Sequence, residues 1–191
     1  MSAGRTVAVT LLTLVAAGLA WLLFVGLPRW YDEPTKAAAA APPPPVPAPP
    51  GRKIKALLFY VSEDGARLTG VERDVTYGSG TVQQAAQIIA AQIAPVSEPL
   101  VSAIPPGTML RSLFVTQRGD AYVDLTRDVA TAHPGGSVEE LLTIYTIVNA
   151  LTANLPAVSA VQLLVDGKEV DTLAGHVDLR RPLTKNLDWV Q

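Results

Sequence analysis

Cysteine is absent from the 191-residue chain, and histidine occurs only twice. Without thiols the protein has no disulfides, iron–sulfur clusters, thiolate zinc sites or cysteine nucleophiles, and no lipid-bearing cysteine of the bacterial lipoprotein type. An excess of one charge is also lacking, because the formal net charge is only -2 and the basic residues are scattered. Such a chain does not generate the field that nucleic-acid binding requires, so we expect no nucleic-acid partner.

Charged residues are missing altogether from residues 7–27, where Thr10 and Thr13 are the only polar residues. About 20 residues suffice for a helix to cross the hydrocarbon layer. Trp21 lies inside the run, and Trp30 and Tyr31 follow it, as aromatic residues at the membrane interface do. We therefore predict a cytoplasmic head at residues 1–6 and a transmembrane helix at residues 7–27. The chain is expected to cross the inner (cytoplasmic) membrane of a bacterium once, with its C-terminal domain outside the cytoplasm.

A cleaved signal peptide is the alternative interpretation of this run. Its apolar region is normally about 7–15 residues long and ends in small residues at the cleavage site. Here the small residues Ala16, Ala17, Gly18 and Ala20 precede a strongly apolar stretch that begins at Trp21. Cleavage among them would leave an apolar new N-terminus, which favours a retained anchor.

Residues 28–52 form a Pro/Ala-rich stalk that contains the sequence KAAAAAPPPPVPAPP. Proline fixes φ and has no amide donor, so this tract favours extended polyproline II. At about 3.1 Å per residue it acts as a semi-rigid spacer of a few tens of ångströms. A ligand for SH3-type modules is the alternative, but a spacer fits better directly after an export helix.

The remaining residues, 53–191, are sufficient for one domain with a single core. The apolar run at residues 54–61 predicts a central strand covered on both faces, and residues 71–76 predict an edge strand. Further strands are predicted at residues 110–116, 121–126 and 161–165. The predicted fold class is α+β, with a mixed sheet of about five or six strands and two helices packed on one face.

The two helices are predicted from apolar residues at helical spacing. The first begins at Thr81, and the second begins at Ser137 and ends at Pro156. Gln84 and Glu140, three residues into each helix, complete a capping-box pattern. The packing surface of the first helix is predicted to consist of Val82, Ala85, Ala86, Ile89 and Ile93.

The domain lacks the residue spacings that mark common catalytic sites. His133 and His176 both lie beside glycine or proline in loops, and their spacing is not that of metal ligands. No serine has a G-x-S-x-G context, and Asp124, Asp128 and Glu139 have no arrangement that defines a catalytic carboxylate pair. We therefore expect no enzymatic activity, no catalytic or metal-binding residues and no cofactor.

A series of short motifs nevertheless covers most of the domain in a fixed order. They are Phe59-Tyr60, Leu68–Val75, Pro99-Leu100, Ile104–Thr108, Ala121–Leu125, Gly135–Ser137 with Glu139-Glu140, Val165–Gly167, His176–Leu179 and Arg181–Leu183. In this order and spacing the domain resembles the GerMN domain family, named for the bacterial sporulation and spore-germination protein GerM. The resemblance implies an extracytoplasmic bacterial module with a fold similar to that of ring-building modules in sporulation membrane complexes. It implies no catalytic residues.

Two functions are consistent with these features. The first is a non-catalytic envelope module that binds an envelope protein partner or self-associates, with edge pairing through residues 71–76 as one route. Sporulation, spore germination or another cell-envelope process is its expected setting. The second is binding of peptidoglycan, or as a weaker variant wall hydrolysis through Asp124 or Glu139. The partner or ligand surface is expected where three loops border one groove, at Ile104, Pro105, Pro106, Gly107, Gly135, Gly136, Arg180 and Arg181.

Overall fold

A computed structural model describes residues 14, 16, 17, 19–26 and 51–191. The chain divides into two compact units, Met1–Pro44 and Pro45–Gln191. The described part of the first unit includes the π-helix η1 (Leu22–Gly26). Within the described residues, no helix is both long and apolar enough to cross a membrane. Residues 7–13, 15, 18 and 27 of the predicted transmembrane helix, the head and nearly all of the stalk lie outside the described residues.

The second unit begins with a two-stranded antiparallel sheet. Strand β1 (Lys53–Val61) pairs with β2 (Leu68–Thr76) along its whole length, from Lys53 opposite Thr76 to Val61 opposite Leu68. The consecutive residues Leu58, Phe59 and Tyr60 are all buried, so both faces of β1 are covered, as predicted. The prediction of a central strand is wrong, because β1 has a strand partner on one side only, apart from a single bridge at Val61 to Val101.

The other five strands form a separate mixed sheet. Their order is β3-β4-β5-β6, and β7 also pairs with β5. β4 runs parallel to β5 and antiparallel to β3, and β6 and β7 are antiparallel to β5. The bounds are β3 (Leu110–Val115), β4 (Asp120–Leu125), β5 (Ala160–Val165), β6 (Lys168–Glu169) and β7 (Leu183–Thr184).

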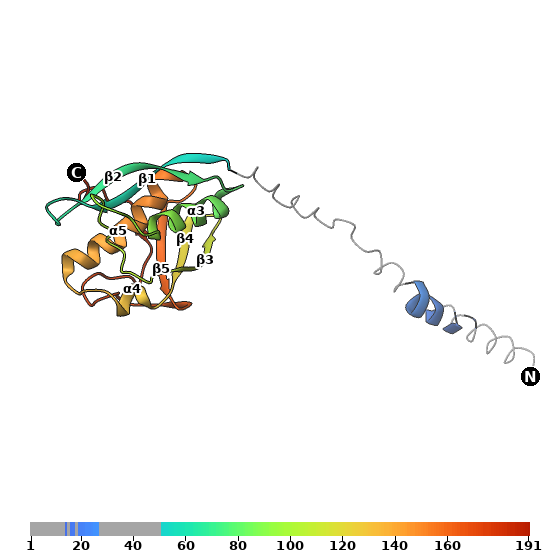
Figure 1. The fold of residues 1–191 in the computed structure, drawn as a ribbon. Coiled ribbons are helices and arrows are strands. Elements are labelled where there is room, and N and C mark those ends of the chain that lie inside the picture. The colour runs from blue at the N-terminus through green and yellow to red at the C-terminus, as the bar shows by residue number, and fades with distance from the viewer. Residues whose placement is uncertain (1–13, 15, 18, 27–50) are drawn as a thin grey trace, which may run out of the picture. The chain divides into compact units, whose positions relative to one another are not determined.

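The long helices lie between the two sheets (Figure 1). α3 (Thr81–Ile93) and α5 (Ser137–Asn154) contact each other, and each contacts the β1–β2 hairpin and the five-stranded sheet. A short helix, α4 (Asp128–Thr131), follows β4 and was not predicted. The α+β class and a mixed sheet of five strands are thus confirmed, with the correction that the hairpin forms a second layer of its own.

Two helix side chains satisfy the second edge of β1. The amide of Gln92 in α3 accepts a hydrogen bond from Phe59 N at 2.9 Å and donates one to Phe59 O at 2.8 Å. The amide of Asn154 in α5 makes the same pair of bonds with Leu57, at 2.8 and 2.7 Å. A primary amide carries one donor and one acceptor side in the pattern of a peptide group, so these side chains replace a neighbouring strand.

The predicted capping boxes do not form. α3 and α5 follow Gly80 and Gly136, whose φ angles are 87° and 91°, and neither helix has a side-chain cap. Gln84 instead binds the preceding loop, accepting from Gly78 N at 2.9 Å and donating to Thr76 O at 3.2 Å. Glu140 binds a different loop, the one that follows β6.

Candidate functional site

A groove lies between the C-terminal end of α3 and the segment that enters β3. Its volume is about 720 Å³. None of the side chains that line it is ionisable; they are Ala90, Ile93, Ala94, Pro95, Ser102, Ile104, Pro105, Pro106, Gly107, Thr108, Met109 and Leu110. Such a groove has the shape and polarity to receive apolar side chains.

The loop that forms one wall of this groove is held in place by internal hydrogen bonds. Ile104, Pro105 and Thr108 are buried. The Thr108 hydroxyl donates to Pro105 O at 2.7 Å, and Ile104 N donates to the Ser102 hydroxyl at 3.1 Å. The turn closes at Gly107 with a φ of 82°, a conformation that favours glycine. Pro106 and Gly107 stay exposed, so the wall is rigid and accessible.

The second predicted loop lies elsewhere. Gly135 and Gly136 both have positive φ, at 88° and 91°, and lead into α5. His133 fixes this turn, since its Nδ1 accepts from Gly135 N at 3.0 Å while its Nε2 lies 3.2 Å from the Thr143 hydroxyl. The neighbouring cavity is small, about 140 Å³, and is lined by Pro134 and Glu139 among others. These contacts give His133 a structural role.

The third predicted loop is also separate from the groove. Arg180 forms an ion pair with Asp178, with Nη2 2.8 Å from Oδ2 and Nε 2.9 Å from Oδ1. The hydrogen bonds from Arg180 hold the pKa of Asp178 well below its usual range. Arg180, Asp178 and His176 line a cavity of about 180 Å³, and Arg181 is exposed. Of the residues predicted to border one groove, Ile104, Pro105, Pro106 and Gly107 line the groove beside α3, whereas Arg180 lines a different cavity.

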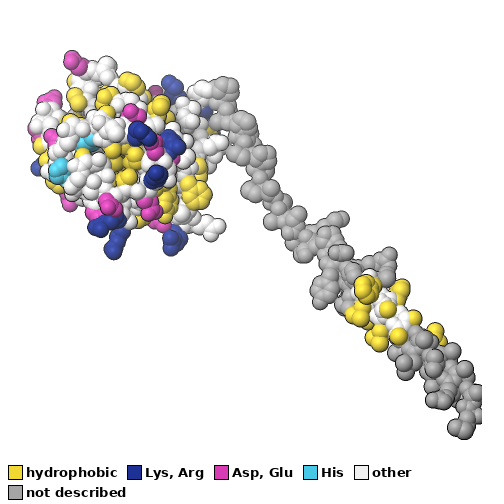
Figure 2. All heavy atoms as spheres, turned by 90° about the horizontal axis from the view of Figure 1, so that it is seen from below, with side chains coloured by type: hydrophobic (Ala, Val, Ile, Leu, Met, Phe, Trp, Pro, Cys, Tyr) yellow, Lys and Arg dark blue, Asp and Glu magenta, His cyan; other side chains and the backbone are white. Residues whose placement is uncertain are grey.

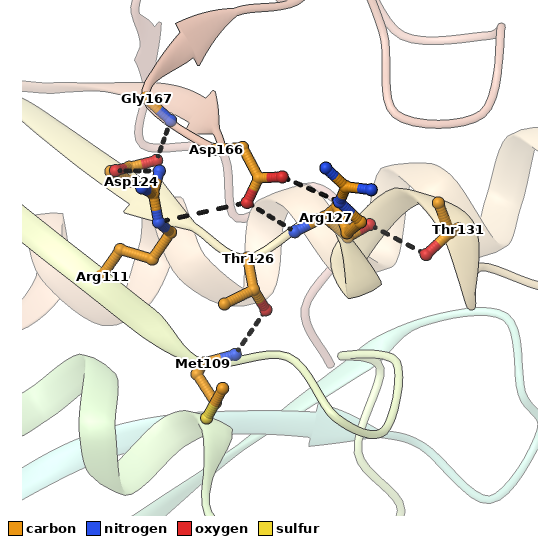
Figure 3. A network of polar contacts seen from close by, with 8 residues as sticks. All are labelled: Met109, Arg111, Asp124, Thr126, Arg127, Thr131, Asp166 and Gly167. Atoms are coloured by element: carbon orange, nitrogen blue, oxygen red, sulfur yellow. Dashed lines mark hydrogen bonds and ion pairs between the residues drawn. The ribbon is translucent and has the colours of Figure 1, made fainter.

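Asp124, one of the acids considered for catalysis, belongs to a polar network at the carboxyl ends of β4 and β5 (Figure 3). Its carboxylate accepts from Arg111 Nη1 at 2.9 Å and from Gly167 N at 2.7 Å. The neighbouring Asp166, whose φ is 51°, pairs with Arg127 Nε at 2.9 Å. The Arg127 hydrogen bond lowers the pKa of Asp166. This network fastens the turn after β5 to β3 and β4, which is a structural task.

Glu140 holds the loop that follows β6. Its side chain is fully buried and accepts hydrogen bonds from the backbone amides of Leu173, Ala174 and His176 at 2.8, 2.9 and 2.7 Å. The ring Nδ1 of His176 lies 3.1 Å from the same carboxylate. Burial raises the pKa of Glu140, but these hydrogen bonds lower it by more, so the net shift is downward.

Charged side chains of both signs share the surface of the described domain. Figure 2 shows basic and acidic side chains side by side on one face of the domain, with hydrophobic side chains between them. No group of three or more His, Asp or Glu side chains within residues 51–191 is arranged to hold a metal ion.

A family model described as sporulation and spore germination, named Germane, matches residues 57–171 of the chain. The match covers more than half of the chain and runs from within β1 to just past β6. The chain belongs to the Germane family. No curated protein sequence matches the chain.

Solved structures share this Germane fold. A candidate lipoprotein from Clostridium perfringens is 23% identical, with a TM-score of 0.50 over 70% of this chain and 88% of that chain. The first GerMN domain of the sporulation protein GerM from Bacillus subtilis is 14% identical, with a TM-score of 0.53 over 69% of this chain and 97% of that one. The tandem GerMN domains of the same protein give a TM-score of 0.55 at 14% identity, over 70% of this chain and 46% of that one. At these identities the likeness concerns the fold.

Part of the groove was not predicted from the sequence of this Germane domain. The helical spacing predicts Ile93 as part of the packing surface of α3, yet it lines the groove together with Ala90. Val82, also assigned to packing, is 43% exposed, whereas Ile88 is fully buried. The buried stripe of α3 is therefore rotated relative to the prediction. An apolar Met109 shortly after a Pro-Pro-Gly turn is the sequence feature that could have indicated this part of the groove.

Proposed function

We propose that this protein is a non-catalytic interaction module of the bacterial cell envelope, which docks apolar side chains of a partner protein into the groove beside α3. The predicted transmembrane helix anchors it in the inner membrane, and the stalk holds the domain outside the cytoplasm. The family description supports a setting in sporulation, spore germination or a related envelope process.

The chemistry of the groove lining carries this proposal. Hydrolysis requires an acid and a base at hydrogen-bonding distance from the substrate, and none of the residues that line the groove supplies either. Glycan binding relies on several polar groups that fix the sugar, whereas this lining offers only two hydroxyl side chains, Ser102 and Thr108. The apolar walls and exposed Met109 match the anchoring pockets of protein interfaces.

The buried acids support the same interpretation. Asp124 accepts hydrogen bonds from Arg111 and Gly167, and Glu140 accepts from three backbone amides and lies against His176. Each carboxylate is therefore engaged in holding a loop. A catalytic carboxylate needs an oxygen directed at substrate instead.

Site-specific photocrosslinking of the full chain in its native membrane tests the proposal. A photoreactive amino acid at Met109, which is 62% exposed, is expected to give discrete protein adducts. A charge placed in the groove by Ala90→Glu is expected to abolish them, and the same photoreactive group at Leu187, 49% exposed, serves as the control. Adducts that persist in Ala90→Glu contradict the proposal. Sedimentation of the chain with peptidoglycan sacculi without protein adducts identifies wall binding instead.

A further inference from the structure

Strand β3 leaves one edge of the five-stranded sheet open. Thr116 N donates to Asp120 O at 2.9 Å as the β3–β4 hairpin closes, so alternate residues from Thr116 back along β3 bond to β4. Leu113 and Val115 lie between them and direct their amides and carbonyls outward. Within residues 51–191, the structure gives these outward groups no hydrogen-bond partner.

The side chains along this edge do not prevent pairing with another strand. Natural proteins protect open edges with charged residues, proline or bulges. From Ser112 to Val115, β3 carries no charge, and Phe114 is 62% exposed on the open face. Hydrophobic side chains also reach the surface on the flank where β3 lies (Figures 1 and 2).

The edge of β2, the pairing route expected from the sequence, is better protected. It carries the exposed charges Glu72, Arg73 and Asp74, and Leu68 already exchanges hydrogen bonds with Trp189 and Gln191. Antiparallel self-pairing centred on Glu72 or Arg73 places like charges opposite each other, which is destabilising. Self-pairing centred farther toward Leu68 meets the segment that already occupies that edge.

We propose that two copies of this chain pair through β3, antiparallel about a two-fold axis that passes between their Phe114 residues. In this register Leu113 of one copy lies opposite Val115 of the other, so that outward amides and carbonyls meet. Phe114 packs on Phe114 of the second copy, and Ser112 lies opposite Thr116. No like charges oppose each other in this stretch, and the interface is isologous, as two-fold dimers require.

The exposed flank of α3 is compatible with this arrangement. Val82, Ala86 and Ala90 share one side of the helix by their spacing of four residues, and Ala90 lines the groove next to Met109. A two-fold axis perpendicular to the joined sheet keeps both α3 helices on the same face. The β3 pairing makes no use of Ala90, which stays available to line the groove.

The β3 dimer adds one named partner, a second copy of the chain, to the proposed function. It rests on that function only because both treat the domain as an interaction module. Its surface is the β3 edge, whereas the proposed partner groove lies beside α3. Ala90→Glu in the groove and substitutions at Phe114 therefore separate the two ideas.

Disulfide crosslinking of the full chain in membranes tests the register, because the natural chain has no cysteine. In the proposed dimer the two Phe114 positions form a non-hydrogen-bonded pair with Cα atoms about 4.5 Å apart, within the range of a disulfide. The two Ser112 positions are about 14 Å apart, since they are offset by four residues at about 3.4 Å each and the strands lie about 4.8 Å from each other. Phe114→Cys is expected to give a covalent dimer on mild oxidation, whereas Ser112→Cys and the exposed Val101→Cys remain monomeric.

A charge exchange provides a second test that does not depend on oxidation. Full-length Phe114→Lys and Phe114→Glu, each made with two different affinity tags, are expected to lose co-purification of the two tagged forms by at least about tenfold. Mixing Phe114→Lys with Phe114→Glu is expected to restore it. The proposal is overturned if Phe114→Cys gives no dimer, if Ser112→Cys crosslinks equally well, or if the mixed charges fail to restore co-purification.

Discussion

At the scale of single residues, Glu140 shows how one carboxylate can organise a distant loop. It lies in the first turn of α5, yet its hydrogen bonds reach residues 173–176, more than 30 positions further along the chain. A fully buried charge is tolerated only when hydrogen bonds replace its hydration. The three backbone amides and His176 supply that replacement, so the charge and the loop depend on each other.

Glu140→Gln tests this dependence. The substitution keeps the shape of the side chain but removes its charge and directs an NH₂ group at amides that need an acceptor. We expect the free energy of unfolding to fall by about 1.5–3 kcal/mol, the range for lost hydrogen bonds to a charged group. Urea unfolding measures the change. The exposed neighbour Glu139 provides the control, since Glu139→Gln is expected to cost less than about 0.5 kcal/mol.

The same carboxylate predicts how stability depends on pH. The pKa of Glu140 lies below its ordinary value of 4.5 in the folded protein, so on acidification the unfolded state takes up the proton first. The stabilisation is therefore fully present above pH 4.5 and is lost as pH falls through the folded pKa. Unfolding free energies measured from about pH 7 to about pH 3 are expected to decline less steeply in Glu140→Gln than in the natural chain. Parallel pH profiles would contradict this assignment.

At the scale of elements, β1 is joined to the helical layer by side-chain amides in place of a neighbouring strand. Gln92 and Phe59 are both fully buried, so the backbone groups of Phe59 have no access to water if the amide is removed. Asn154 and Leu57 are only partly buried. The contribution of Gln92 to stability is therefore expected to exceed that of Asn154.

Gln92→Leu is predicted to lower the free energy of unfolding by about 2–4 kcal/mol, because it leaves one buried amide and one buried carbonyl unpaired. Asn154→Leu is predicted to cost less, since water reaches the freed groups of Leu57. Gln87→Leu, at a partly exposed position of the same helix, controls for helix propensity and is expected to stay within about 0.5 kcal/mol. Equal costs for Gln92→Leu and Gln87→Leu, by urea unfolding, would rule out the amide bridge.

The elements differ in how far the sequence predicts them. Apolar runs and turn residues identified β1, β3, β4, β5 and both long helices, because these patterns are local. The separation into two sheets was missed, since it depends on Gln92 and Asn154 reaching β1 across 33 and 97 positions. The capping boxes failed because Gly80 and Gly136 occupy the cap positions, leaving Gln84 and Glu140 free to bind loops.

The candidate site was predicted only in part, because local sequence patterns identify single loops but not which loops meet. The Pro-Pro-Gly turn identifies an exposed, rigid loop by its composition alone, and Ile104, Pro105, Pro106 and Gly107 all line the groove. Gly135, Gly136, Arg180 and Arg181 are not among the residues that line this groove, because topology decides which loops meet. Their use as a partner or ligand surface stays a prediction.

At the scale of the whole molecule, the folded domain is expected to be independent of the N-terminal segment. The buried core runs from Ala56 in β1 to Leu179 near the C-terminus and draws on both sheets and both long helices. A fragment of residues 51–191 is therefore predicted to unfold cooperatively, with a midpoint within about 2 °C of the domain transition in the full chain. Circular dichroism on heating measures both. A fragment that melts without cooperativity would show that the preceding residues stabilise the fold.

The proposed anchor gives the β3 interface a second determinant, which is local concentration. Tethering to one bilayer confines the copies to a thin layer, and linked partners meet at effective concentrations that reach the millimolar range. A single pair of short strands with one aromatic contact on its open face is a weak interface in free solution.

Crosslinking of Phe114→Cys is therefore expected to be efficient for the full chain in liposomes and at least about tenfold weaker for residues 51–191 at the same bulk concentration. Attaching the fragment to the liposomes through a hexahistidine tag and a nickel lipid is expected to restore it, because the tag replaces the anchor without adding a contact. Equal crosslinking of the free and the attached fragment would mean that β3 pairing needs no tether. Efficient crosslinking only with residues 1–50 present would place part of the interface in that segment.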